Sequence, residues 1–201
     1  MTARPQLDPG REVADVHTLD ARSPAHFLFP TRLVPLYEPA TAYAAQSFPP
    51  GQPILAGAID FMRRIRGDFR YDQSATLIST PLSEAFDARG GVCQDFAHIM
   101  IAGLRGIGLP ATYVSGYIRT IPPEGKPRLE GADASHAWIN VWCGAAAGWL
   151  GLDPTNALQV NDDFVEIAIG RDYADVAPLD GIILISGKQT LKVSVDVKPV
   201  G

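Results

Sequence analysis

Three side chains in this sequence could together perform nucleophilic chemistry: Cys93, His136 and Asp153. Cys93 lies just inside the predicted start of a helix, shortly after Gly90 and Gly91. The free N–H groups and the partial positive charge at a helix N-terminus favour a thiolate. A thiol that also pairs with a histidine there has a pKa of about 3.5–7.5, instead of about 8.5. The same N–H groups can bind the oxyanion of an attacked carbonyl, and the two glycines are expected to leave room for a substrate.

The spacing of His136 and Asp153 predicts that both residues lie on one face of a β-hairpin. His136 opens one predicted strand (136–142), and Asp153 closes the next (148–153). Direct pairing of the two residues centres the turn within about one residue of the middle of the loop 143–148. Directly opposed residues on antiparallel strands have Cβ atoms about 4.5–5.5 Å apart. The carboxylate could then hold one ring nitrogen of the histidine while the other nitrogen faces the thiol.

The segments that carry these residues predict helices followed by strands. Apolar residues recur at helical spacing from 53 to 69 and again from 92 to 107, where Gly106, Gly108 and Pro110 end the pattern. A short turn or helix is expected over 81–87. Strands are expected over 111–118, 136–142, 148–153, 164–169 and 182–185. This order indicates an α+β domain with an antiparallel sheet.

The two ends of the chain have patterns of their own. Residues 1–50 are rich in proline, and HFLFPTRLVPLY (26–37) is typical of an extended segment, suited to an edge strand or a crossing arm. In TLKVSVDVK (190–198), apolar and polar residues alternate. That alternation predicts a half-buried antiparallel strand.

Three motifs, in the same order, resemble the bacterial transglutaminase-like superfamily of cysteine enzymes, which are often described as candidate cysteine proteases. The motifs are GGVCQDFAHIMIAGLRGIGLPATYVSGYI (90–118), SHAWINVW (135–142) and GWLGLDPTN (148–156). The similarity covers roughly residues 55–175, and GRDYADVAP (170–178) is similar to the segment that follows the aspartate motif. The resemblance implies a papain-like, transglutaminase-core fold in which a nucleophile helix packs on an antiparallel β-sheet.

Carried over by position, the resemblance implies a catalytic role for each of the three residues. Cys93 would be the nucleophile, His136 the base and Asp153 the carboxylate that orients the base. We therefore divide the chain into an extended N-terminal arm (1–50), which could be the tail of a truncated β domain, and a transglutaminase-like catalytic core (51–201).

The donors to the oxyanion depart from the pattern of animal transglutaminases. Those enzymes place a tryptophan well before the nucleophile, whereas the three tryptophans of this chain all follow Cys93. The backbone N–H of Cys93 is therefore expected to be one donor, with Gln94 or Tyr71 as the second.

Other side chains near the three residues have less specific interpretations. Trp138 points the same way as His136 along its strand, so it is either core or a lining residue of the acyl groove. Asp95 is well placed against the helix dipole and is a weaker candidate for a catalytic part. His98 lies about 140° around the helix from Cys93 and is interpreted as a surface or core histidine.

Composition excludes several classes of protein. The 201 residues are 46% hydrophobic and 19% charged, with a net charge of −5, so neither a nucleic acid nor a membrane is expected as a partner. The N-terminal residues show no signal-peptide core, and no apolar run has bilayer length, so a cytoplasmic location is expected. The histidines lack metal-ligand spacing, so no metal and no cofactor are expected.

The sequence thus predicts a cysteine-dependent acyl-transfer enzyme that forms a thioester from a peptide, protein or other amide substrate. Water as the acceptor would make it a protease or amidase, which is the default expectation, and an amine would make it a transglutaminase. One alternative is a non-catalytic peptide-binding module on the same fold, which has no reason to lower a cysteine pKa. Another is acetyl transfer of the arylamine N-acetyltransferase type, which RGGVC (89–93) resembles.

Overall fold

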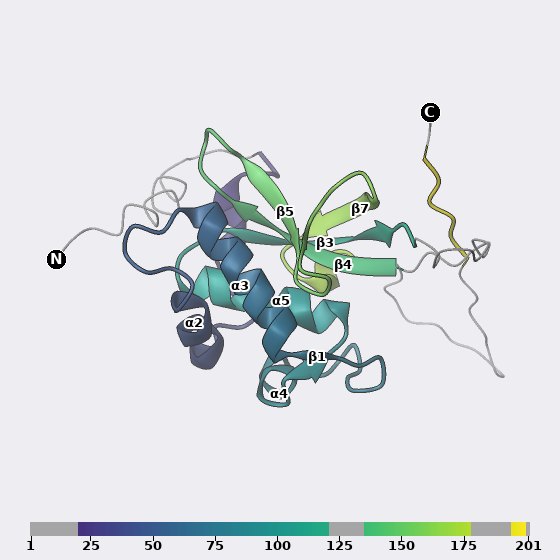
Figure 1. The fold of residues 1–201 in the computed structure, drawn as a ribbon, viewed down its shortest axis with the longest axis horizontal. Helices are drawn as coiled ribbons and strands as arrows, with labels where there is room; N and C mark the ends of the chain where they lie inside the picture. The colour runs from purple at the N-terminus through teal and green to yellow at the C-terminus, as the bar shows by residue number, and fades with distance from the viewer. Residues whose placement is uncertain (1–19, 121–134, 178–193, 200–201) are drawn as a thin grey trace.

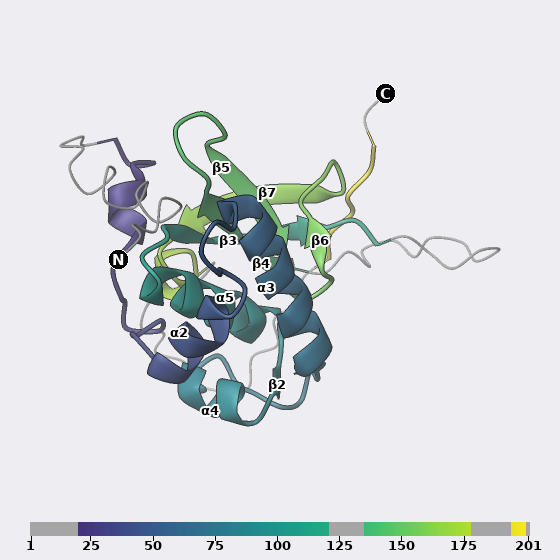
Figure 2. The same ribbon diagram turned by 60° about the vertical axis from the view of Figure 1, so that its left-hand side comes forward.

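A computed structural model describes residues 20–120, 135–177 and 194–199. In this part of the chain the main helices gather on one face of an antiparallel sheet (Figures 1 and 2). The predicted α+β arrangement, with the helix of Cys93 packed on the sheet, is confirmed. No helix among the described residues combines the length and apolarity needed to cross a bilayer.

Five strands form the main sheet, in the spatial order β6-β5-β4-β3-β7, and every neighbouring pair is antiparallel. Their bounds are β3 Ala111–Ile118, β4 Ser135–Trp142, β5 Trp149–Asp153, β6 Leu158–Gln159 and β7 Phe164–Gly170. The predicted strand 182–185 lies outside the described residues. So does the first part of 190–198, and residues 194–199 carry no strand.

The helices follow the predicted periodicity closely. Helix α3 spans Ile54–Asp68, α4 spans Leu82–Asp87 and α5 spans Cys93–Gly106. Helix α5 packs against β3 and β4 on one side and against α2, α3 and α4 on others. All its residues from 94 to 105 are therefore buried, including the polar residues Asp95, His98 and Arg105.

The N-terminal segment contains helical structure that its proline content did not predict. A 3-10 helix, η2, spans Pro24–Phe27, and no strand forms over 26–37. Helix α2 spans Glu38–Ala45 and packs closely on α5. A Cβ at Gly103 would lie 2.8 Å from the Cβ of Ala44, so the two helices approach to a distance that only glycine permits. The domain boundary at residue 50 stays a prediction.

Arg105 of α5 ties the N-terminal segment to the core. The guanidinium is buried and donates to four backbone carbonyls, those of Phe27, Phe29, Ala111 and Arg171. A buried charge is tolerated when hydrogen bonds satisfy it. Desolvation lowers the pKa of Arg105 to about 10, which leaves the group charged at neutral pH.

Candidate active site

Cys93 is the first residue of α5, as predicted, and its side chain is half-buried. Asp95 caps this helix: its carboxylate accepts the backbone N–H of Val92 at 2.8 Å and the hydroxyl of Thr76 at 2.5 Å. Burial raises the pKa of Asp95. The first-turn N–H groups of the helix have no intrahelical acceptor, so Cys93 stands where the sequence analysis required it.

The two glycines before Cys93 have a different role from the one expected. Gly90 and Gly91 form the short strand β2, which pairs in parallel with β1 (Arg70–Tyr71). A Cβ on Gly91 would lie 2.4 Å from Oδ2 of Asp95. The space above this glycine therefore holds the capping carboxylate, and the expectation that it admits substrate is wrong.

His136 and Asp153 lie on one face of the β4–β5 hairpin, as predicted, but they are not directly opposed. Ile139 pairs with Leu152, and this register continues to place Asp153 across from Trp138. The loop is closed by the backbone N–H of Cys143, which donates to the carbonyl of Gly148 at 2.9 Å. The prediction of direct pairing is therefore wrong by two residues. Because a strand repeats every two residues, the shared face is unchanged.

Asp153 is completely buried and accepts hydrogen bonds at both carboxylate oxygens. His136 Nε2 donates to Oδ2 at 2.8 Å, and Asn156 Nδ2 donates to the same oxygen at 2.7 Å. The backbone N–H groups of Thr155 and Asn156 donate to Oδ1 at 2.9 and 3.3 Å. The sequence analysis missed Asn156. The turn sequence DPTN (153–156) could have indicated its role, because an aspartate at the start of such a turn accepts hydrogen bonds from the backbone two and three residues later.

Cys93 and His136 interact directly. The thiol hydrogen-bonds to the imidazole, and because Asp153 occupies Nε2, Nδ1 is the nitrogen available to the sulfur. Burial alone would lower the pKa of His136, but the hydrogen bonds and charges of Asp153 and Cys93 outweigh burial and raise it to about 9. The three predicted residues are thus brought together in the order thiol, imidazole, carboxylate.

Two aromatic rings lie beside the imidazole of His136. Trp138 is 1% exposed, and its ring centroid lies 6.2 Å from that of His136. Phe164 packs edge-on against Trp138 at 5.3 Å and lies 6.3 Å from the imidazole. Trp138 thus lies on the same face of β4 as His136, as predicted, and packs beside the imidazole as a buried apolar side chain.

The two candidates for the second oxyanion donor lie on segments next to Cys93: Gln94 follows it in α5, and Tyr71 lies in β1, which pairs with the strand before it. Tyr71 pairs with Gly91 between β1 and β2 and is 41% exposed. Its ring contacts that of Phe96, with the two centroids 6.4 Å apart. Gln94 is buried and its side-chain amide donates to the carbonyl of Ile78 at 3.2 Å. Gln94 therefore also anchors the loop before α4.

Two further residues near the site belong to the core. Tyr113 of β3 is buried, and burial together with the charge of nearby Cys93 raises the pKa of its phenol. His98 packs against Tyr113 at 5.1 Å between centroids, and its Nε2 accepts the backbone N–H of Tyr173. Burial lowers the pKa of His98 to about 4. His98 is therefore a neutral core residue, as interpreted from the sequence.

The arrangement supplies the parts of nucleophilic acyl chemistry. A thiol at a helix N-terminus contacts an imidazole, whose orientation is fixed by a buried carboxylate. Among the residues that the structure describes, no three His, Cys, Asp or Glu side chains are grouped so that they could hold a metal ion.

Comparison with known proteins gives concordant matches. A family model described as the transglutaminase-like superfamily matches residues 42–154, which include all three residues. An uncharacterised protein of Mycobacterium tuberculosis is 45% identical over 201 residues, covering 98% of this chain and 60% of that protein. The chain thus spans about 60% of the length of this relative.

Two other matches carry more descriptive names. A protein-glutamine gamma-glutamyltransferase of Pseudomonas aeruginosa is 39% identical over 101 residues, covering 47% of this chain and 15% of that protein. The crystal structure of a candidate cysteine protease from Cytophaga hutchinsonii superimposes with a TM-score of 0.65 and 28% identity, covering 82% of this chain and 51% of that chain. The papain-like, transglutaminase-core fold is thereby confirmed. This chain belongs to the transglutaminase-like superfamily.

Proposed function

We propose that this protein is a cysteine-dependent acyl-transfer enzyme that acts on an amide bond. The observation that carries the proposal is the contact of the Cys93 thiol with His136, whose Nε2 is held by Asp153 at 2.8 Å. A peptide-binding module needs no hydrogen-bonded thiol and imidazole. Acetyl transfer is less well supported, because the two matches with descriptive names reported above are a glutamyltransferase and a candidate protease.

In the first half of the reaction, the sulfur of Cys93 adds to the amide carbonyl carbon. The backbone N–H of Cys93 donates to the oxyanion, and Gln94 and Tyr71 are the candidates for the second donor. The His136 imidazolium then gives its proton to the amide nitrogen. The C–N bond breaks, the amine leaves, and a thioester remains on Cys93.

In the second half, an acceptor attacks the thioester. Neutral His136 removes a proton from water, the resulting hydroxide adds to the carbonyl carbon, and the carboxylic acid leaves as the C–S bond breaks. The proton returns to Cys93. A primary amine in place of water would yield a new amide. We propose hydrolysis as the main reaction and a peptide, a protein or another amide as the substrate.

The first test is the pH dependence of alkylation by iodoacetamide, with mass spectrometry resolving the two cysteines. Cys93 is expected to react well below pH 8, and the reaction below that pH should disappear in His136→Ala. Cys143 is an internal control because burial raises its pKa to about 11. Equal titration of both thiols, or an inert Cys93, would overturn the proposed mechanism.

The second test is turnover. Proteins with accessible glutamines are incubated with the enzyme, with and without a fluorescent primary amine. Released ammonia or peptides report hydrolysis, and label incorporation reports amine transfer. Cys93→Ala should abolish both readouts while its circular dichroism and melting temperature match those of the parent, and Cys143→Ala should retain them. Activity that survives in Cys93→Ala would refute the assignment of the nucleophile.

A further inference from the structure

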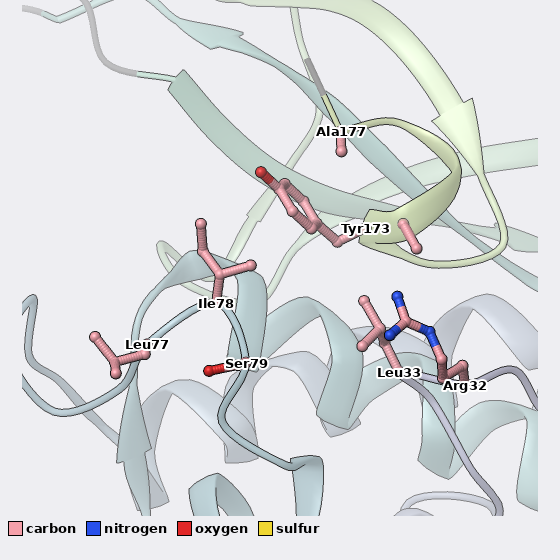
Figure 3. Close-up of a pocket in the computed structure, with 8 residues that line it drawn as sticks. Arg32, Leu33, Leu77, Ile78, Ser79, Tyr173 and Ala177 are labelled. Atoms are coloured by element: carbon pink, nitrogen blue, oxygen red, sulfur yellow. The ribbon is translucent and has the colours of Figure 1, made fainter. Parts of the chain in front are cut away.

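A pocket of about 530 Å³ lies between the loop before α4, the N-terminal segment and the segment after β7. Figure 3 shows Leu77 and Ile78 on one side of this pocket and Arg32 and Leu33 on the other, with the ring of Tyr173 between them. The lining residues are Arg32, Leu33, Leu77, Ile78, Ser79, Tyr173, Ala174 and Ala177. None of them is part of the thiol, imidazole and carboxylate arrangement.

One wall of the pocket is attached to the start of α5. The amide of Gln94, the residue after Cys93, donates to the carbonyl of Ile78 at 3.2 Å. The hydroxyl of Thr76 donates to the capping carboxylate of Asp95 at 2.5 Å. The loop that carries Leu77 and Ile78 is therefore held beside the nucleophile by two side chains of its helix.

The opposite wall is held by a buried carboxylate. Asp172 is 3% exposed and accepts the backbone N–H groups of Leu33 at 3.1 Å and Ala174 at 2.8 Å. Tyr173 lies between them in the short helix η3 (Tyr173–Asp175), and its N–H donates to His98. Residues 172–174, which take no part in the thiol, imidazole and carboxylate arrangement, thus join the N-terminal segment to form one pocket wall.

The lining combines exposed apolar side chains with a single charge. Leu77 is 75% exposed and Ile78 is 63% exposed, although both lie on an anchored loop. Grouped exposed apolar side chains of this kind mark contact surfaces. Arg32 is the one charged lining residue, and within the described residues its guanidinium forms no ion pair. In Figure 3 it points toward the segment of Tyr173.

We propose that this pocket binds the substrate beside the reacting amide. An apolar side chain of leucine size contacts Leu33, Leu77 and Ile78, and a carboxylate of the same substrate pairs with Arg32. The inference rests on the proposed function, because it names the substrate class of that site: amides whose neighbouring part is apolar and anionic. A cationic substrate would meet only the like charge of Arg32.

The binding test uses Cys93→Ala, so that no reaction interferes, and the ligands N-acetyl-glycyl-leucine and its C-terminal carboxamide. Methyl NMR signals of Leu33, Leu77 and Ile78 should shift with the carboxylate ligand. The carboxamide should bind about two- to fivefold more weakly, as for an exposed ion pair. Adding Arg32→Gln should remove this difference and Arg32→Glu should reverse it. Arg63→Gln, at an exposed arginine of α3, is the matched control and should keep it.

The reaction test uses the parent protein and chloroacetyl-glycyl-leucine, from which the sulfur of Cys93 displaces chloride to form an S–CH₂ bond. Its rate should exceed that of the carboxamide analogue about two- to fivefold, and the ratio should approach one in Arg32→Gln. Iodoacetamide, which lacks the leucine, measures the thiol alone. Suppose that Cys93 of the parent reacts with iodoacetamide at low pH, but that the carboxylate and carboxamide reagents react at equal rates. This result would refute substrate binding by the pocket and leave the proposed catalytic mechanism intact.

The converse result is also distinguishable. If Cys93 is inert to iodoacetamide while the NMR shifts depend on Arg32, the pocket chemistry stands and the catalytic proposal fails. If the methyl signals do not shift, or if Arg32→Gln behaves as Arg63→Gln does, the pocket is not the binding site.

Discussion

His136 and Asp153 meet at 2.8 Å although they are offset along the hairpin, with the carboxylate two residues nearer the turn than direct opposition would place it. The diagonal contact lets Asp153 approach Nε2 while Trp138, its nearest cross-strand neighbour, lies beside the imidazole with the two rings tilted by 31° and their centroids 6.2 Å apart. The carboxylate therefore holds the ring from the side of β5. Nδ1 is left for the thiol.

The charge of His136 predicts the pH above which the proposed activity declines. Its pKa is raised from 6.5 to about 9, so the imidazolium that would protonate the leaving amine in the proposed mechanism persists at neutral pH. We expect kcat/KM for an amide substrate to fall as the pH rises through about 9, and the NMR titration of His136 to show the same midpoint. The stability contributed by this cation is present in full below pH 6.5 and is lost over the same rise. A midpoint near 6.5 would contradict the contacts described.

Substitution of the carboxylate should separate orientation from nucleophilicity. In Asp153→Asn the pKa of His136 should fall, since the anion that stabilises the imidazolium is gone, and turnover should drop about 10²–10⁴-fold. The measurement is kcat/KM together with the NMR titration of His136. Loss of turnover with an unchanged titration would show that Asp153 acts on something other than His136.

Asn156 is expected to be a positioning residue that acts through Asp153. Asn156→Ala removes a 2.7 Å hydrogen bond to Oδ2, and a bond to a charged group contributes about 1.5–3 kcal/mol. We expect kcat to fall about tenfold with little change in KM, accompanied by a shift of the alkaline midpoint. Asn156→Asp would place a second anion beside Asp153 and should not restore activity. Equal loss of stability and activity, without a shift in the pH profile, would indicate a purely structural role.

The capping contact at α5 predicts a strong effect of a single methyl group. In Gly91→Ala the new Cβ would lie 2.4 Å from Oδ2 of Asp95, so the cap would be displaced, at about 1–3 kcal/mol of unfolding free energy. The matched control is Gly67→Ala in α3, where a Cβ meets nothing within 4 Å and should stabilise the helix by about 0.5–1 kcal/mol. Urea unfolding measures both, and equal effects would rule out this account of Gly91.

His98 predicts a loss of stability in acid. Its folded pKa of about 4 lies below the unfolded value of 6.5, so its contribution is present in full above pH 6.5 and is lost as the pH falls through 4. The loss between pH 7 and pH 4 is about 3 kcal/mol. Unfolding free energies at these two pH values should differ less in His98→Gln than in the parent. An unchanged difference would exclude His98 as the sensitive group.

Periodicity accounts for the parts that the sequence predicted well. The helices 54–68 and 93–106 have strong apolar repeats, and β3 has the predicted bounds. The face shared by His136 and Asp153 was predictable for the same reason, because an even shift of register leaves a strand's faces unchanged. The register itself depends on backbone hydrogen bonds of the loop. Those bonds place the turn at the centre of 143–148, so the loop length was a better guide than direct pairing.

Tertiary contacts account for the parts that it predicted poorly. Helix α2 has only eight residues, and its packing against Gly103 and Gly106 of α5 involves partners distant in sequence. The polar residues Asp95, His98 and Arg105 of α5 each bind groups from segments distant in sequence. Local pattern cannot show that such partners exist. The same holds for Asp172, whose contact with Leu33 joins residues 139 positions apart.

The carbonyls gathered around Arg105 also bear on how the chain acquires its native state. The guanidinium takes acceptors from residues 27 and 29, from 111 and from 171, so its desolvation is compensated only after all three regions have docked. In a folding intermediate that lacks one of these regions, the guanidinium of Arg105 is short of acceptors, so burying it is unfavourable. Folding is therefore expected to be cooperative, because Arg105 couples the ordering of residues 27 and 29 to that of residue 171, which directly follows β7.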